Sequence, residues 1–450
     1  MTADFEVLRG QLTGTIATPG QPGYELAEPW NLAVPVTPAA VVAVADADDV
    51  AHTVRFAAEH GLRVAVQITG HGAVPLGDDV LLVHTAKLDE CVVDAERRVA
   101  RIGAGVVWQR VVDAAAPHGL APLSGSAPHV GVVGYLTGGG IGPLAATFGV
   151  SSDYVRAFDV VAGEGQVRHV TATEHPDLFW GLRGGKATLG IVTAVEVELL
   201  PLASVYGGSF FFDGSESAAV LHAWASWSAD LPDHATTSAV LVELPNSPRL
   251  PPAIAGKRLI AVRYASVADE QQAEEAFMPL RGVATPLLGG IGEIPAAEIG
   301  SIHADPTDAM PYQEYSVLLD SLPSDAVDAL LAVAGPGSGS PLVVELRRLG
   351  GAIAKDAAHP SAVSHRDAAY SVGLVGRTSP ESGDAVAGVA ARTLAALEGW
   401  SSGGRMVNFG ASADPAEIAR AYDAETLQRL GALARQYDPK GTLAVGQVVR

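Results

Sequence analysis

Two glycine-dense segments constrain this 450-residue chain more than any other feature of its sequence. One has four glycines within residues 138–142, and the other has four within residues 181–190. Glycine lets the backbone approach a ligand without interference from a Cβ atom, and its N–H group can point at a pyrophosphate. One such cluster is equally well explained by tight turns. Two clusters, together with the turn Ile-Thr-Gly-His-Gly at 68–72, favour a ligand of the dinucleotide type.

The hydrophobic pattern before residue 200 predicts strands that alternate with helices. Residues 38–67 predict a strand, a helix and a second strand, with Asp46 or Asp48 as the helix N-cap and Gly61 as its left-handed C-terminal residue. Two hairpins, an amphipathic helix, a short helix and a long strand are predicted to follow. This part of the chain therefore has an α/β character.

The pattern changes near Pro201. From residue 204 to 400, strand-like segments such as RLIAVRYA and LVVELRRLG alternate with helical segments such as SDAVDALLAVAG. This alternation predicts an α+β layer with a largely antiparallel sheet covered by helices. The last segment, 414–439, is predicted to be helical and to stop at a proline.

Composition excludes several classes of protein. Lys and Arg number 29 against 50 Asp and Glu, a net charge of −21, which argues against a nucleic acid or an anionic membrane as partner. Cys91 is the only cysteine, so neither an intrachain disulfide nor a cysteine-rich metal site is expected, and no metal site is predicted. We find no signal-peptide pattern and no stretch of 18 apolar residues, so a soluble, cytoplasmic protein is expected.

Other dinucleotide and catalytic motifs fit poorly. A Rossmann site needs G-x-G-x-x-G directly after a strand and opening a helix, but GGGIGPLAATFG lacks the preceding hydrophobic strand and carries Pro143. The chain has no GxxxxGK[ST], HExxH or GxSxG motif. A nicotinamide-dependent reductase, which would bind NAD(P)H, stays open as a competing class.

Taken together, the motifs resemble those of the FAD-linked oxidases of the vanillyl-alcohol oxidase superfamily, which have PCMH-type FAD-binding domains. The shared order is the β-α-β unit, the Gly-His turn, GGGIG, DLFWGLRGG…GIVT and a terminal YDP. The chain is most similar to the berberine-bridge-enzyme-like flavoproteins, and among them to singly tethered 6-hydroxynicotine-oxidase-like members. The resemblance covers residues 25–200 and 400–450, with further matches at 344–352 and 364–370.

The resemblance implies a cofactor, FAD, that is bonded through its 8α-methyl group to His71. Many family members add a bond from a cysteine in a G-x-C-P-x-V-G loop, but Ala127 stands there in this chain, so no cysteinyl bond is expected. The implied cofactor-binding residues share glycine loops or polar positions around the flavin: His71, Gln67, Thr69, Gly70, Gly72, Ala127, His129, Val130, Gly131, Gly134, Gly138, Gly139, Gly140, Gly142, Gly190, Val192, Asn408 and Gln447.

The chain also departs from the family pattern. Gln67 replaces the arginine of R-x-G-G-H, and Lys186 interrupts the usual glycine run. Met406 replaces a tyrosine that often serves as base in sugar and alcohol oxidases, which argues against carbohydrate oxidation. Glu345 and Tyr370 are the candidate catalytic bases. The alternative interpretation of Glu345 is an ion pair with a neighbouring arginine. The alternative interpretation of Tyr370 is packing within the sheet.

The resemblance implies an architecture and an activity. An FAD-binding domain is expected from residues 1–200 and 405–450, as two α/β subdomains, with a substrate-binding domain at 201–404. The expected enzyme is an FAD-dependent oxidoreductase that moves a hydride or electron pair from a hydrophobic, aromatic or secondary-metabolite molecule to flavin and then to O2. The alternative is a catalytically altered binding or resistance protein of the same fold. A monomer or homodimer is expected.

Overall fold

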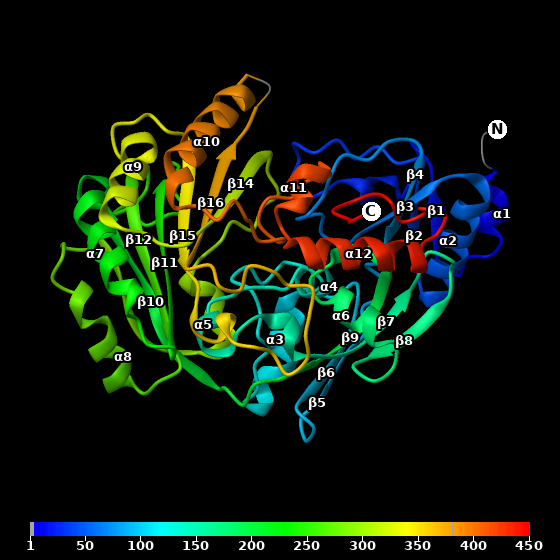
Figure 1. The fold of residues 1–450 in the computed structure, drawn as a ribbon, viewed down its shortest axis with the longest axis horizontal. Helices are drawn as coiled ribbons and strands as arrows, with labels where there is room; N and C mark the ends of the chain where they lie inside the picture. The colour runs from blue at the N-terminus through cyan, green and yellow to red at the C-terminus, as the bar shows by residue number, and fades with distance from the viewer. Residues whose placement is uncertain (1–3, 380) are drawn as a thin grey trace.

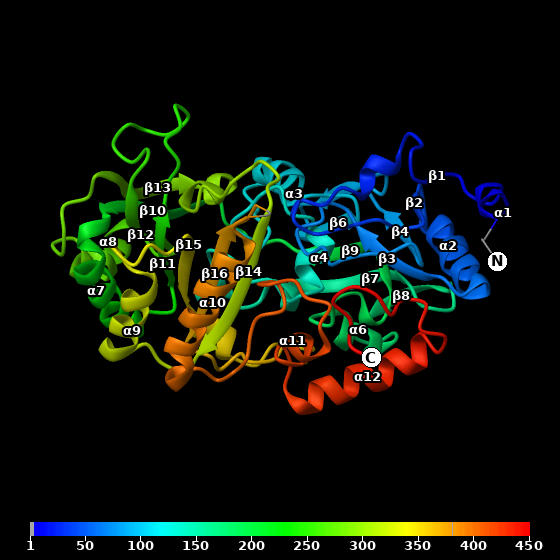
Figure 2. The same cartoon turned by 90° about the horizontal axis from the view of Figure 1, so that it is seen from above.

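Three β-sheets form the frame of the molecule in the computed structural model, which describes residues 4–379 and 381–450. They follow one another along the long axis, with the four-stranded sheet near the N-terminus and the seven-stranded sheet at the opposite end (Figure 1). The same order is visible from above (Figure 2). A five-stranded sheet lies between them, so the middle of the molecule is where elements of all three sheets meet.

The four-stranded sheet carries the predicted β-α-β unit. Its strands, in spatial order, are β1 (Thr15–Ala17), β2 (Ala40–Ala43), β4 (Val80–His84) and β3 (Arg63–Gln67). Both β2 and β3 run parallel to β4. Helix α2 (Ala47–His60) begins at Asp46, whose side chain accepts from the Asp49 N–H, and ends at Gly61 with φ 68°. The structure thus selects Asp46 of the two expected N-caps.

The five-stranded sheet is antiparallel and is packed against helices. Its strands are β5 (Cys91–Asp94), β6 (Val99–Gly103), β9 (Ile191–Glu198), β7 (Val155–Val161) and β8 (Val167–Thr171). Its helices are α3 (Trp108–Ala115), α4 (Val132–Leu136), α6 (Pro176–Leu182) and α12 (Ala424–Tyr437). One apolar core joins all of these elements, and it includes Leu430 and Leu433 of α12. The C-terminal segment therefore returns to the half of the molecule formed by the first 200 residues.

The seven-stranded sheet is antiparallel throughout and is covered by helices, as expected for an α+β protein. Its strands are β13 (Leu288–Pro295), β10 (Ser204–Asp213), β12 (Arg258–Ser266), β11 (Ala235–Glu243), β15 (Leu342–Arg348), β16 (Tyr370–Arg377) and β14 (Tyr312–Leu319). Its helices are α7 (Ser217–Ala229), α8 (Glu270–Phe277), α9 (Ser324–Ala334) and α10 (Gly383–Leu397).

The alternation of side chains along β14 and β15 decides which residues lie on the face of the seven-stranded sheet that the helices leave uncovered. Val344 and Leu346 of β15 and Val317 of β14 belong to the core under the helices. Because successive side chains of a strand point to opposite faces, Arg347 and Glu314 point the other way, toward the middle of the molecule. This sheet therefore supplies charged side chains to the region where the three sheets meet.

Two features differ from the sequence expectation. Strand β13 was not predicted: it lies at the sheet edge, has three glycines among its eight residues, and pairs with β10 mainly through its backbone. The helical segment at the C-terminus is divided into α11 (Pro415–Ala419) and α12, because Asp423 begins a new helix by accepting from the Thr426 N–H. Short helices α1 (Phe5–Arg9) and α5 (Ala145–Phe148) complete the α-helices of the described residues.

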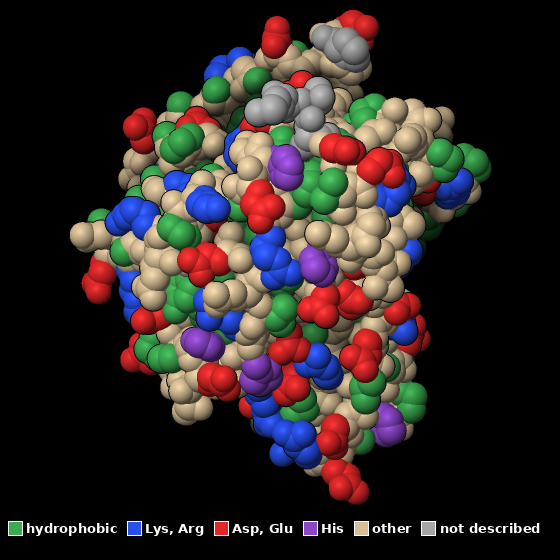
Figure 3. All heavy atoms as spheres, turned by 90° about the vertical axis from the view of Figure 1, so that its right-hand side faces the viewer, with side chains coloured by type: hydrophobic (Ala, Val, Ile, Leu, Met, Phe, Trp, Pro, Cys, Tyr) green, Lys and Arg blue, Asp and Glu red, His purple; other side chains and the backbone are tan. Residues whose placement is uncertain are grey.

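The surface at the end of the molecule that carries α1 and α2 is mixed in charge. Acidic and basic side chains are interspersed over this face (Figure 3). In the described part of the chain, no helix combines the length and the apolar character that crossing a bilayer requires.

Candidate active site

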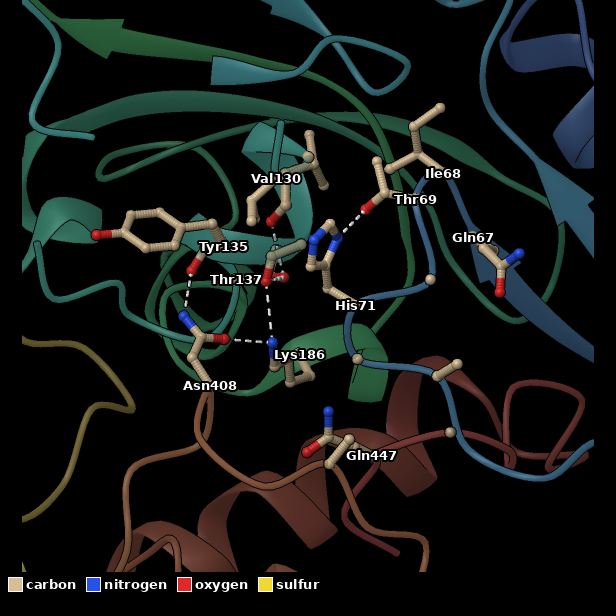
Figure 4. Close-up of a pocket in the computed structure, with 18 of the residues that line it drawn as sticks. Gln67, Ile68, Thr69, His71, Val130, Tyr135, Thr137, Lys186, Asn408 and Gln447 are labelled. Carbon is tan, nitrogen blue, oxygen red and sulfur yellow. Dashed lines mark hydrogen bonds between the residues drawn. The ribbon is translucent and has the colours of Figure 1, made fainter. Parts of the chain in front are cut away.

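A cavity of about 420 Å³ opens where the three sheets meet. Its walls come from five parts of the chain: the turn after β3, residues 125–141 around α4, the loop from Lys186 to β9, strands β14 and β15, and the two C-terminal loops around Asn408 and Gln447. Elements far apart in sequence thus contribute to one site, and Figure 4 shows His71, Lys186 and Asn408, which come from three of them.

His71 points into this cavity from the turn after β3 (Figure 4). Gly70 makes the turn possible: it has φ 73°, and a Cβ there would lie 2.6 Å from the Pro29 Cα. The Nδ1 atom of His71 is 2.8 Å from the Thr69 hydroxyl oxygen. Its Nε2 atom is buried and has no hydrogen-bond partner among the described residues.

Burial keeps the His71 imidazole neutral. It lowers the pKa of His71 to about 3, with a smaller contribution from His129. Trp30 stacks against both imidazoles, with ring centroids 4.5 Å from His71 and 4.4 Å from His129, and the two imidazole centroids lie 5.0 Å apart. The ring of His71 is therefore held in one orientation, with its unpartnered Nε2 atom available to a ligand.

The structure brings together most of the predicted cofactor-binding residues. Those that line the cavity are Gln67, Thr69, Gly70, His71, Gly72, Ala127, Val130, Gly131, Gly134, Gly190, Val192, Asn408 and Gln447. The Gln67 side chain is turned to the carbonyl oxygens of residues 26–28, at 3.3–3.4 Å. The Gln447 Oε1 atom is buried and lacks a partner among the described residues, so it can accept from a ligand.

The remaining predicted cofactor-binding residues lie outside the cavity wall. His129 is held in the stack with Trp30. Gly138, Gly139, Gly140 and Gly142 pack against protein atoms instead of lining the cavity. At Gly138, a Cβ would collide with the Asn408 side chain and with the Lys186 Cε. This is a correction: the glycine run makes room for neighbouring side chains and backbone rather than for the ligand itself.

Neither predicted catalytic base lines the cavity. Glu345 accepts from Arg263 Nη1 at 2.5 Å and from Arg347 Nε at 2.9 Å. Burial alone would raise the pKa of Glu345, but these two arginines outweigh it and lower the pKa to about 2. The Tyr370 hydroxyl lies 3.1 Å from the Ser228 hydroxyl, in the core under the helices. Both placements correct the sequence expectation and correspond to its alternatives, ion pairing and sheet packing.

Sequence reasoning missed three polar side chains in the wall, Glu314, Tyr312 and Lys186. Burial raises the pKa of Glu314 to about 7, although a hydrogen bond from the Gly410 N–H opposes the rise. Burial also raises the pKa of Tyr312. The sequence signal was weak because Tyr312 and Glu314 lie in the first half of β14, before its apolar residues 317–319.

Lys186 is the centre of a hydrogen-bond network at one side of the cavity (Figure 4). Its Nζ donates to the Gly134 carbonyl oxygen at 2.9 Å and to the Asn408 Oδ1. The Asn408 Nδ2 donates in turn to the Tyr135 carbonyl oxygen at 2.8 Å. The network joins α4, the loop before β9 and the C-terminal return.

Comparison with known proteins agrees with this geometry. Residues 38–171 match the FAD binding domain family. The chain is 33% identical over 207 residues to the FAD-dependent monooxygenase prx3 of Penicillium roqueforti, covering 45% of this chain and 40% of that protein. It is 32% identical over 194 residues to (R)-6-hydroxynicotine oxidase of Paenarthrobacter nicotinovorans, covering 42% of each. The matched part spans only about two fifths of these curated relatives.

Solved structures extend the likeness to the whole fold. The crystal structure of 6-hydroxy-D-nicotine oxidase from Arthrobacter nicotinovorans superposes with a TM-score of 0.84 at 24% identity, covering 98% of both chains. The Physcomitrella patens BBE-like 1 structure superposes with a TM-score of 0.85 at 19% identity, covering 98% of this chain and 97% of that one.

Fold and site together define a protein with an FAD-binding domain. The residues present suit that cofactor, since the cavity offers a glycine turn, a neutral imidazole and the unpartnered Gln447 oxygen. Residues 38–171 carry the FAD-binding domain, and the fold of the whole chain is that of the 6-hydroxy-D-nicotine oxidase and BBE-like 1 structures.

Proposed function

We propose that this protein is an FAD-dependent oxidase that takes a hydride from a hydrophobic small molecule, with O2 as the electron acceptor and the flavin bonded to His71. The observation that carries the proposal is the His71 imidazole, which is neutral, oriented by Thr69 and Trp30, and has a buried nitrogen without a partner among the described residues. Such a nitrogen is a nucleophile for the 8α carbon of a flavin.

The free nitrogen also favours a particular attachment. Because the Thr69 hydroxyl occupies Nδ1, we propose that the bond forms at Nε2. A second tether from a cysteine is not part of the proposal, since Ala127 lines the cavity where many relatives carry that cysteine, and Cys91 lies in β5.

The chain's own residues divide the remaining work. When bound, FAD supplies the hydride acceptor. Glu314 accepts the proton of a substrate hydroxyl or amine as the hydride leaves the adjacent carbon, because burial raises its pKa to about 7. Dioxygen then takes two electrons and two protons and leaves as hydrogen peroxide. Glu314 replaces Glu345 and Tyr370 as our candidate base.

Apolar side chains in the wall support a hydrophobic substrate. Phe409, Ile141 and Ala411 line the cavity beside Tyr312. Met406 is not part of this wall and is buried beneath it. A catalytically silent binding protein is the less favoured alternative, because Glu314 provides a proton acceptor in the cavity.

We also propose that the expected division of the chain describes its working parts. Residues 1–200 and 405–450 carry the walls around His71, Lys186, Asn408 and Gln447, and residues 201–404 carry Glu314 and Arg347. On this view the reaction takes place between a cofactor-binding part and a substrate-binding part.

The test is to follow flavin through denaturation in the wild-type protein and in His71→Ala. In the wild type, yellow colour and flavin fluorescence should stay with the polypeptide after acid precipitation, and the modified peptide should contain His71. In His71→Ala, the flavin should pass into the supernatant or be absent. Free flavin released from the wild-type protein would refute the tether, and a wild-type protein that takes up no flavin would refute the function.

Thr69→Val tests how the imidazole is oriented. Loss of the hydroxyl frees Nδ1, so we expect the bond to form at least several-fold more slowly when flavin-free protein is incubated with FAD. Thr173→Val, at an exposed threonine before α6, is the matched control. Equal rates in the two variants would show that Thr69 does not hold the ring.

A further inference from the structure

Lys186 is a cation in the cavity wall that has no carboxylate partner. It lies in the loop between α6 and β9, and both groups that its Nζ contacts are neutral oxygens, the Gly134 carbonyl and the Asn408 amide. The ion pairs of the described residues include Lys355 with Asp233 but none with Lys186. A charge removed from water without a counter-ion is costly, so its presence here requires an explanation.

The surrounding backbone is arranged to hold this ammonium group in place. Lys186 has φ 53°, a left-handed conformation that residues with a side chain rarely adopt. The Lys186 N–H donates to the Thr137 carbonyl oxygen at 2.9 Å, which fixes the loop. At Gly138, a Cβ atom would collide with the Lys186 Cε and the Asn408 side chain, so glycine leaves room for both. A strained lysine in the wall and a glycine behind it therefore serve the same contact.

The network leaves one N–H of the ammonium group for a ligand. Asn408 Nδ2 donates to the Tyr135 carbonyl oxygen, so its Oδ1 must accept from Lys186. An ammonium group has three donors, and two of them are used. Burial lowers the pKa of Lys186 to about 8, with the Arg405 charge adding to the effect, and an anionic ligand would raise it again.

The position of Lys186 in the cavity indicates which part of the cofactor it faces. Asn408, which accepts from Lys186, is followed in the chain by Phe409 and Gly410. The Arg347 Cζ atom lies 5.1 Å from the centroid of the Phe409 ring, and the Gly410 N–H donates to Glu314. Here the seven-stranded sheet adjoins the cofactor-binding half, because its residues Glu314 and Arg347 line the same cavity as Lys186. Substrate must meet the reacting ring of the cofactor at this place.

We propose that Lys186 is a further catalytic residue, whose ammonium group stabilises the negative charge that the isoalloxazine ring gains on reduction. The inference rests on the proposed function. In that reaction two electrons and one proton pass from the substrate carbon to the ring as a hydride, which leaves the ring with one added negative charge. The substrate's own hydroxyl or amine proton goes to Glu314, so atoms and charges balance.

The experiment compares flavin-loaded wild-type protein with Lys186→Met, which removes the charge, and Lys186→Arg, which keeps it. Lys440→Met, at an exposed lysine, is the matched control. We expect Lys186→Met to weaken the two-electron reduction equilibrium at least tenfold, which lowers the midpoint potential by about 30 mV. Sulfite donates its electron pair to the oxidised ring and leaves one negative charge on it, so its dissociation constant should rise at least tenfold.

Lys186→Arg and Lys440→Met should stay within about threefold of the wild type in both measurements. A midpoint potential and sulfite affinity that do not change in Lys186→Met would overturn the inference while leaving the proposed function intact. Lower flavin occupancy in Lys186→Met with an unchanged midpoint potential would also overturn the inference. That result would indicate that Lys186 contacts the pyrophosphate of the cofactor instead of its ring. If Lys186→Met does not fold, Lys186→Gln keeps a donor for Gly134 and Asn408 and carries the same expectation.

Discussion

Two glutamates on the seven-stranded sheet show how far the surroundings of a side chain decide its chemistry. Glu345 lies between Arg263 and Arg347, and its pKa is lowered to about 2, so it is a poor proton acceptor. Glu314 has no such pair of arginines in contact, and burial raises its pKa to about 7. A carboxylic acid with a pKa near the working pH is the better general base.

Glu314→Gln should remove the proton acceptor and its pH dependence. A base acts only when deprotonated, so the wild-type rate of flavin reduction should rise with pH through about 7 and then level off. In Glu314→Gln we expect the plateau rate to fall by about 10²-fold or more and this rise to disappear. Stopped-flow reduction of the flavin across pH 5–9 measures both effects.

Glu298→Gln, at an exposed glutamate, serves as the control for Glu314→Gln and should keep the wild-type profile. A wild-type-like profile in Glu314→Gln would show that another group accepts the proton.

Single residues also set the limit of sequence-based prediction. His71 was found because its glycine turn is local in sequence, and the structure places its side chain in the cavity. Glu314 and Arg347 reach the same cavity only because of the register of their strands. That register depends on pairing between strands that are distant in the chain, and no local pattern reports it.

At the scale of elements, the β-α-β unit followed its sequence pattern closely because capping and hydrophobic spacing act over a few residues. Strand β13 did not, because an edge strand rich in glycine shows little hydrophobic alternation. Asp49 links α2 to the N-terminal segment, a contact that the helical pattern does not reveal. Its carboxylate is 1% exposed and accepts from the N–H groups of Thr13, Gly14 and Ala45, each at 2.8 Å.

Asp49→Ala should therefore loosen the N-terminal segment from α2. Three partly buried N–H groups would lose a charged acceptor, so we expect destabilisation by about 3 kcal/mol. Urea unfolding followed by circular dichroism measures the loss, and hydrogen exchange should increase first around β1. Asp48→Ala changes an exposed residue of the same helix turn and should cost less than about 1 kcal/mol. Equal midpoints for the two variants would contradict this role.

At the scale of the whole molecule, contacts between distant segments hold the cavity together. Asn31 exchanges two hydrogen bonds with the backbone of Tyr312, at 3.0 and 3.1 Å. The Arg366 guanidinium donates to both oxygens of Asp153 at 2.8 Å, and these side chains are only 18% and 13% exposed. These contacts join the seven-stranded sheet to the half that carries His71.

Arg366→Ala should weaken this connection, because it leaves the largely buried Asp153 carboxylate without its cation. We expect a loss of about 2–3 kcal/mol in stability and faster proteolysis of the segment before β16. Arg97→Ala removes an exposed partner of Asp94 at 3.9 Å and should have almost no effect. A double-mutant cycle with Asp153→Ala should give a coupling energy above 1 kcal/mol, and a value near zero would refute the link.

The sequence by itself determined the features that depend on short-range chemistry: the β-α-β unit, the glycine turn that presents His71, the absence of a second cysteine, and the FAD-binding domain. The tertiary structure decided which side chains share the cavity. It turned Glu345 and Tyr370 away, brought in Glu314 and Lys186, and showed that the glycine run at 138–142 accommodates protein atoms. Propensity and capping act within a few residues, whereas burial, ion pairing and the pKa of a side chain depend on neighbours supplied by distant strands.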